Sequence, residues 1–175
     1  MKKNNFILNA KDLASYICYR YFKIYAKGKK EISPIKLQKS LYFLFAYWGG
    51  FVRKNNNNID YVEEKINQSE YLFEDEFHAW VYGPVIPKIF GMYKNNEIDY
   101  KELNEDEVFN GTDNFVKETI DSLLDELFEI ADFKLVSISH EDNCWKDHFD
   151  IFDNEHNEVI PRDEIVNEYA LRETV

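Results

Sequence analysis

The segment Leu72–Pro87, with the sequence LFEDEFHAWVYGPVIP, constrains the fold more than any other part of the chain. Gly83 accepts a positive φ angle, and Pro84 both fixes its own φ angle and disfavours a helical conformation at Gly83. The chain must therefore turn sharply at this dipeptide. Pro87 then favours the first turn of a new helix, where its missing N–H costs nothing. We expect one small β-hairpin near residues 71–82, against which helices pack.

Most of the remaining chain has the periodicity and the start signals of amphipathic helices. The expected starts are Asn9, Ser33-Pro34, Thr112 or Asp113, Asp132, Asn143 and Pro161. The first helix should cover about residues 10–26, stop at Gly28 and bury a stripe of Leu13, Ile17, Tyr21 and Ile24, with Cys18 beside it as an inert thiol. The helix after Asp113 should bury Phe115, Ile120, Leu123, Leu124, Leu127 and Phe128. Residues 97–113 are acidic and loop-like.

The helix that begins at Ser33-Pro34 should be the central one. Its expected core face is Leu37, Leu41, Leu44, Phe45 and Trp48, and Tyr42, Phe43 and Tyr47 extend the apolar surface almost all round. We expect Lys36, Gln38 and Lys39 to keep its first turns in contact with solvent. The helix should end at Gly49-Gly50 or slightly beyond, before an exposed loop over residues 53–58 and a short helix over residues 61–68.

These patterns predict a mainly α, compact helical bundle with a single domain over residues 1–175. The chain has 45% apolar and 17% aromatic residues, which exclude general disorder. No apolar run reaches the ~18 residues of a membrane span, and the N-terminus lacks the features of a signal peptide. Two cysteines do not form a disulfide framework, so we expect a cytoplasmic protein.

The net charge of −12 conceals a marked asymmetry. Residues 1–58 hold 12 Lys and Arg against two acids, whereas residues 59–175 hold nine against 31. The simplest interpretation is that basic and acidic helices lie side by side and neutralise each other. The alternatives are a basic patch for an acidic partner, or an acidic face that imitates nucleic acid or binds a basic protein. The charge balance and the lack of a helix-turn-helix pattern argue against direct nucleic-acid binding.

The sequence contains one set of residues with the chemistry of a metal or nucleophile site. His140, Cys144 and His148 are spaced by four residues, and His156 would supply a fourth ligand. Asn143, however, should begin a new helix and so separate His140 from Cys144. A Cys144 nucleophile would need a lowered pKa, a base and an orienting group, and the sequence identifies no third group. We therefore expect no metal, no cofactor and no enzymatic activity.

Three separated blocks of sequence resemble one known family. Ile35–Phe43 (IKLQKSLYF) is similar to its K-L-Q-K-L-L-Y-F helix, and Ala79–Val85 (AWVYGPV) to its A-W-x-Y-G-P-V block. Ser139-His140, with Asp142 and Trp145, resembles its T-H-x-E-x-P-W segment. By these blocks the chain is identified as a member of the Panacea (SocA-like) antitoxin domain family, which is common on prophages and other mobile elements.

The resemblance implies a protein-binding function. Family members neutralise toxins encoded beside them, often by direct contact, and the SocA-type member delivers its toxin to a Clp-type protease. The chain departs from the family pattern at Ser40, where Leu is preferred, at His78, where an acid is common, and at Cys144, where Pro is usual. The segment 54–71 is also longer than the family's.

We expect a protein partner to bind an aromatic-rimmed surface, because interface hot spots are enriched in Trp, Tyr and Arg. The candidate contact residues are Tyr42, Glu74, Asp75, Glu76, His78, Trp80, Tyr82, His140 and Trp145. For His140 and Trp145 a second interpretation is structural, with Trp145 closing the core and His140 bonded to a backbone carbonyl near Tyr82.

Three functional hypotheses follow. The first is an antitoxin that binds a cognate toxin, with delivery to a Clp-type protease as an added step. The second is a phage or mobile-element inhibitor of a host defence effector, for example a CRISPR effector, acting through its acidic surface. The third is a hydrolase based on Cys144 and His140, which the sequence supports least.

Overall fold

The structure is a computed structural model that describes residues 5–57, 68–153 and 157–172. Within these ranges the chain forms eight α-helices, one π-helical segment and one small three-stranded sheet, so the expected mainly α fold is confirmed. The elements are α1 (Ala10–Tyr19), η1 (Arg20–Tyr25), α2 (Pro34–Asn57), β1 (Phe77–Trp80), β2 (Gly83–Val85), α3 (Pro87–Lys94), α4 (Glu105–Val108), α5 (Asn114–Glu129), α6 (Asp132–His140), α7 (Asn143–Lys146), β3 (Val159–Ile160) and α8 (Arg162–Leu171).

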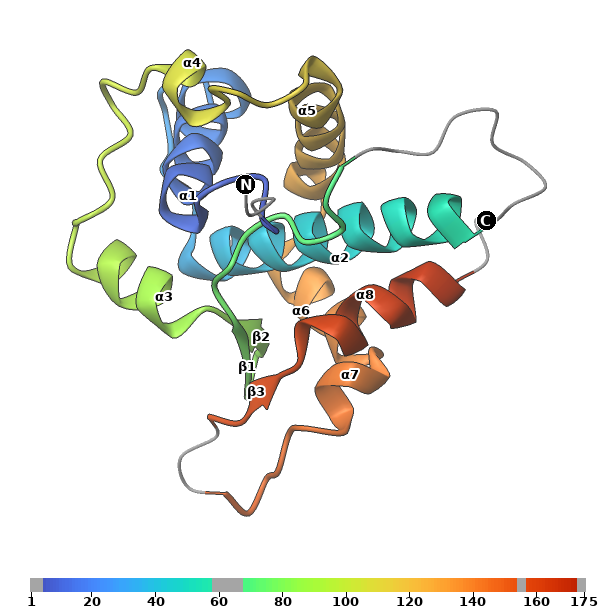
Figure 1. Ribbon diagram of the computed structural model, residues 1–175. Coiled ribbons are helices and arrows are strands. Elements are labelled where there is room, and N and C mark those ends of the chain that lie inside the picture. Colours follow the sequence, from blue (N-terminus) through green and yellow to red (C-terminus); the bar gives the residue numbers. More distant parts are fainter. Residues whose placement is uncertain (1–4, 58–67, 154–156, 173–175) are drawn as a thin grey trace.

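Helix α2 runs through the centre of the molecule, with α1 and α5 on one side and α6, α7 and α8 on the other (Figure 1). All the residues of its expected core face are buried, namely Leu37, Leu41, Leu44, Phe45 and Trp48. Ser33 begins the helix as predicted, because its hydroxyl oxygen accepts a hydrogen bond from the N–H of Lys36 at 2.9 Å. No helix in the described ranges, α2 included, is long and apolar enough to cross a membrane.

The C-terminal half of α2 differs from the expectation. The helix continues through Gly49-Gly50 to Asn57, so the loop expected at residues 53–58 is wrong over residues 53–57. The two glycines form the crossing point with α8: a Cβ atom at Gly50 would lie 2.7 Å from the Tyr169 Cβ atom. Arg53 then fixes the next turn by pairing with Glu70 and Asp163, each at 2.6 Å. Tertiary packing therefore overrides the local helix-breaking signal.

The cap predicted for the first helix is confirmed, whereas the α-helical turns predicted after Tyr19 are wrong. The Asn9 side chain accepts hydrogen bonds from the N–H groups of Lys11 and Asp12. Beyond Tyr19 the helix widens into the π-helical segment η1, which has more residues per turn. The wider turn rotates Ile24 out of the predicted stripe, and its side chain is exposed.

The predicted hairpin is present, shifted to residues 77–85. Strands β1 and β2 pair antiparallel, with Trp80 opposite Gly83, and Gly83 has the expected positive φ angle of 90°. Strand β3 pairs with the other edge of β1. Strand β3 was not expected from the sequence, because two residues carry no detectable strand pattern.

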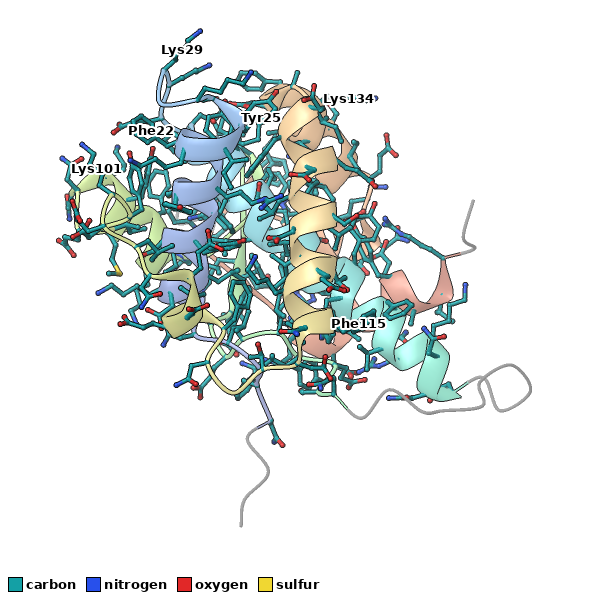
Figure 2. All side chains as sticks on the ribbon, turned by 90° about the horizontal axis from the view of Figure 1, so that it is seen from above. Phe22, Tyr25, Lys29, Lys101, Phe115 and Lys134 are labelled. Atoms are coloured by element: carbon teal, nitrogen blue, oxygen red, sulfur yellow. The ribbon has the colours of Figure 1, made fainter. Side chains whose placement is uncertain are left out.

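The remaining helices follow the predicted start signals with small changes. Asp113 caps α5 through the N–H of Phe115, whose own side chain is exposed rather than buried. Figure 2 shows Phe115 at the start of α5, beside the C-terminal half of α2. Asp132 and Asn143 are the first residues of α6 and α7 rather than their caps. The acidic segment 97–113 contains the short helix α4, and the helix expected at residues 61–68 lies almost wholly outside the described residues.

Several basic residues of the first third pair with acids from the rest of the chain. The Arg20 guanidinium lies 3.4 Å from Asp121 and 2.8 Å from Asp125, both on α5. The Lys36 amine lies 3.4 Å from Asp132. For these residues, as for Arg53, the interpretation of mutual neutralisation is confirmed.

The close contact at Gly50 predicts the effect of a single methyl group. Gly50→Ala should lower the free energy of unfolding by about 1–3 kcal/mol, because the added Cβ atom overlaps α8. Gly91→Ala in α3 is the matched control: nothing lies within 4 Å of its Cβ position, so it should stabilise by up to about 1 kcal/mol. Urea denaturation of both variants measures the difference, and equal effects would contradict the crossing-point assignment.

Candidate functional site

The first turns of α2 bury three polar side chains that we expected in solvent. Lys36, Gln38 and Lys39 are only 4%, 2% and 1% exposed, so this expectation is wrong. Buried polar groups are tolerated when they find hydrogen-bond partners. The Lys36 amine lies at the C-terminal end of α5, where it donates to the carbonyl oxygens of Leu127, Phe128 and Ile130. A cation at a helix C-terminus is also favoured by the helix dipole.

Gln38 and Lys39 hold the hairpin and the residues that follow it. The Gln38 side chain accepts a hydrogen bond from the N–H of Ile86 at 2.9 Å and donates one to the Ile86 carbonyl oxygen at 3.5 Å. The Lys39 amine donates to the carbonyl oxygen of Pro84 at 2.7 Å. Two consecutive residues of α2 thereby fix the backbone on the C-terminal side of the turn.

The turn at Gly83 leaves no space for a side chain. A Cβ atom at Gly83 would lie 2.3 Å from the Ser139 Oγ atom and 3.1 Å from the Lys39 amine. Gly83 is therefore required both for its positive φ angle and for the close approach of α6 and α2 to the hairpin.

An apolar pocket of about 330 Å³ opens between the hairpin, the start of α2 and α3. It is lined by Pro34, Ile35, Gln38, Lys39, Trp80, Val81, Tyr82, Val85 and Phe90. Trp80 and Phe90 meet edge to face, with 5.2 Å between ring centroids. The rim is exposed at Val81 (47%) and Tyr82 (56%), and Phe133 of α6 (63%) contacts the Tyr82 ring. We call Val81, Tyr82 and Phe133 the apolar rim.

Trp145 and His140, from the third block that resembles the family, pack together next to the hairpin. The Trp145 indole N–H donates to the carbonyl oxygen of Trp80 at 2.9 Å, and the His140 ring stacks on Trp145 at 4.1 Å. Burial lowers the pKa of His140, although a hydrogen bond with the backbone of Val81 opposes the shift. Trp145 is buried. The contacts of Trp145 match the structural interpretation, in which this residue closes the core, whereas the buried Nε2 atom of His140 has no hydrogen-bond partner among the described residues.

Asp142, from the same block, is a fully buried carboxylate. It accepts hydrogen bonds from the hydroxyl groups of Tyr42 at 2.5 Å and Tyr169 at 2.8 Å, and it pairs with Arg172. Tyr42 therefore lies in the core, fully buried, which corrects its place among the surface contact residues. The network joins α2, α8 and the segment between α6 and α7.

The acidic run does not lie at the pocket. Glu74, Asp75 and Glu76 belong to the segment that leads into β1, where Arg162 of α8 binds the Glu74 carbonyl oxygen and lies 3.8 Å from Glu76. The His78 ring nitrogen Nδ1 lies 2.9 Å from the carbonyl oxygen of Asn157. Of the nine candidate contact residues, only Trp80 and Tyr82 line the pocket.

The spaced histidines and cysteine have other partners. His148 lies between Glu158 and Glu164, at 2.6 and 2.7 Å, and these hydrogen bonds raise its pKa against the effect of burial. Among the described residues no three His, Cys, Asp or Glu side chains are placed to hold a metal ion, and His156 lies outside them.

Two departures from the family pattern lie in the interior rather than on a binding surface. Cys144 is buried against the Tyr42 hydroxyl at 3.3 Å, and burial raises its pKa, which is opposite to the shift that a thiolate nucleophile needs. Ser40 is fully buried, and its hydroxyl has no partner among the described residues. Burial also raises the pKa of Cys18, to about 12, as expected for an inert thiol.

Sequence reasoning missed several residues of the site, namely Ile35, Gln38, Lys39, Val81, Val85, Phe90 and Phe133. One signal was present. The apolar residues of α2 cover nearly its whole circumference and leave little room for a solvent-exposed face. This pattern indicates that the polar residues of α2 are buried as well.

Lys39 makes the stability of the fold depend on pH. Burial lowers its pKa from 10.5 to about 7, so between these values the unfolded chain binds a proton that the folded chain does not. Stability therefore rises with pH through this window, by at most about 1.4 kcal/mol per pH unit. We expect the free energy of unfolding of the wild type to increase relative to that of Lys39→Met between pH 7 and pH 9.5. A constant difference would show that Lys39 does not titrate in this way.

Comparison with protein families finds a match to part of the chain. The model of the family described as "Antitoxin SocA-like, Panacea domain" matches residues 58–146, about half of the chain. The matched part includes the hairpin, α3, α5, α6 and Trp145, whereas the block at Ile35–Phe43 lies before it. No curated protein and no solved structure matches the chain. On the family match, the chain belongs to the SocA-like Panacea antitoxin family.

Proposed function

We propose that this protein is an antitoxin-type binding module, not an enzyme, that neutralises a toxic protein partner by direct contact. The observation that carries the proposal is the apolar rim. Val81, Tyr82 and Phe133 are exposed side by side on a backbone that buried hydrogen bonds hold in place. Exposed aromatic groups on a rigid support are favourable interface anchors, because little conformational entropy is lost on binding. The cognate toxin is the expected partner, and delivery of the complex to a Clp-type protease would be a second step.

The protein-binding proposal is consistent with the chemistry of the interior. The Cys144 thiol is buried with a raised pKa, and both cysteines are free, as in proteins of a reducing cytoplasm. The partner is expected to be the product of a neighbouring gene, and a pull-down from the native host would identify it.

The net charge of −12 favours a second candidate function, inhibition of a host defence effector through an acidic surface. The two candidates differ in their dependence on salt. Contact through the apolar rim should change little between low and high salt, whereas binding through an acidic surface should weaken strongly, because exposed charges are screened.

Alanine substitutions on the rim test the proposed surface. Tyr82→Ala and Phe133→Ala should each weaken binding of the purified partner by about tenfold or more while the fold is retained. Phe51→Ala is the matched control, because Phe51 is a similarly exposed aromatic residue (44%) on α2 that lines a different pocket, with Phe115. Isothermal titration measures all three. Loss of binding in Phe51→Ala alone would assign the interface to the surface between α2 and α5.

A further inference from the structure

The Lys39 amine has hydrogen-bonding capacity that the fold does not use. A protonated lysine carries three N–H donors, and among the described residues the Lys39 amine donates to a single oxygen, the Pro84 carbonyl. In the described part of the chain no carboxylate pairs with it, in contrast to Lys36, which pairs with Asp132. Burial without a paired anion disfavours the protonated amine, so an anion bound beside it would stabilise the charged form and would itself be stabilised by the pair.

The polar groups around Lys39 do not supply that anion. The Gln38 amide is occupied at both ends by the backbone of Ile86. The Ser139 hydroxyl donates to the carbonyl oxygen of Val136. The His140 ring is either neutral or cationic, so it brings no negative charge.

The pocket that Lys39 helps to line is suited to an apolar group. Ile35, Val85, Trp80 and Phe90 line it, and its volume is about 330 Å³. For comparison, an engineered apolar cavity of about 150 Å³ holds benzene. The pocket therefore has room for one large apolar side chain together with a small polar group. The apolar rim continues from its mouth, which gives a surface for residues that precede the one inside.

We propose that this pocket binds the C-terminal residue of the protein partner, with its apolar side chain against Trp80 and Phe90 and its α-carboxylate paired with the Lys39 amine. The inference rests on the proposed function, because it takes the partner to be a protein. A C-terminal residue carries an apolar side chain and a carboxylate on one Cα atom. An internal Asp or Glu would offer the apolar walls only a short stem, and its chain would have to cross the pocket mouth on both sides.

Short peptides test the carboxylate preference directly. N-acetyl-Ala-Ala-Phe with a free carboxylate should bind the full chain roughly tenfold or more tightly than the same peptide with a C-terminal amide. The indole N–H resonance of Trp80, followed by NMR during titration, reports occupancy of the pocket. Equal affinity for acid and amide, or no binding of either at several millimolar, would overturn the proposal.

Two variants distinguish the contribution of the Lys39 amine to peptide binding from that of the apolar pocket. Lys39→Gln keeps a donor for the Pro84 carbonyl oxygen but removes the charge, so the acid should lose its advantage over the amide. Ile35→Trp should fill the pocket with Lys39 left in place, so both peptides should lose binding. Phe51→Ala should change neither. A preference for the acid that survives in Lys39→Gln would overturn the proposal, and if that variant does not fold, unchanged binding in Ile35→Trp would do so.

The partner itself distinguishes failure of this inference from failure of the proposed function. A short Gly-Ser extension at the C-terminus of the partner should weaken its binding to the wild type by about tenfold or more. If the extended partner binds as tightly as the original while Tyr82→Ala still weakens both, the C-terminal inference is wrong and the proposed surface stands. If Tyr82→Ala and Phe133→Ala have no effect, the proposed surface is itself wrong.

Discussion

The fold depends on polar side chains buried in the first turns of α2. Lys36, Gln38 and Lys39 would be costly in the interior if their polar groups were unpaired, and each finds a backbone oxygen instead. Lys36 ties α2 to the end of α5, whereas Gln38 and Lys39 tie it to the residues after Gly83. Because these hydrogen bonds satisfy backbone groups that the small sheet leaves free, they determine where the hairpin lies on the bundle.

The position of the hairpin in turn produces the candidate site. On one side Trp145 holds the backbone of Trp80, and on the other the pocket opens beside Lys39. Cys144, the candidate nucleophile of the sequence, lies in the core instead, as does Asp142, which accepts hydrogen bonds from two tyrosine hydroxyls. The arrangement leaves Tyr82 and its neighbours exposed on a fixed support. Such a support fits a protein that acts by contact, as proposed for this member of the antitoxin family.

Features determined by local chemistry could be predicted from the sequence. The caps at Asn9 and Asp113 and the positive φ angle at Gly83 depend on neighbouring residues alone, and each is present. Features determined by distant packing could not. Gly50 resembles a helix stop, but it is the contact with α8, and Lys39 resembles a solvent-facing residue, but its partner lies 45 positions away. The pocket combines residues from α2, the hairpin and α3, so no single sequence window contains it.

Amide hydrogen exchange in Gln38→Met tests most directly whether the buried side chains of α2 hold the hairpin. Methionine has nearly the shape of glutamine but cannot accept the hydrogen bond from the Ile86 N–H. We expect the amide of Ile86 and those of β1 and β2 to exchange at least about tenfold faster than in the wild type, while the amides of α8 keep their protection. Unchanged exchange at Ile86 and in the hairpin would contradict it.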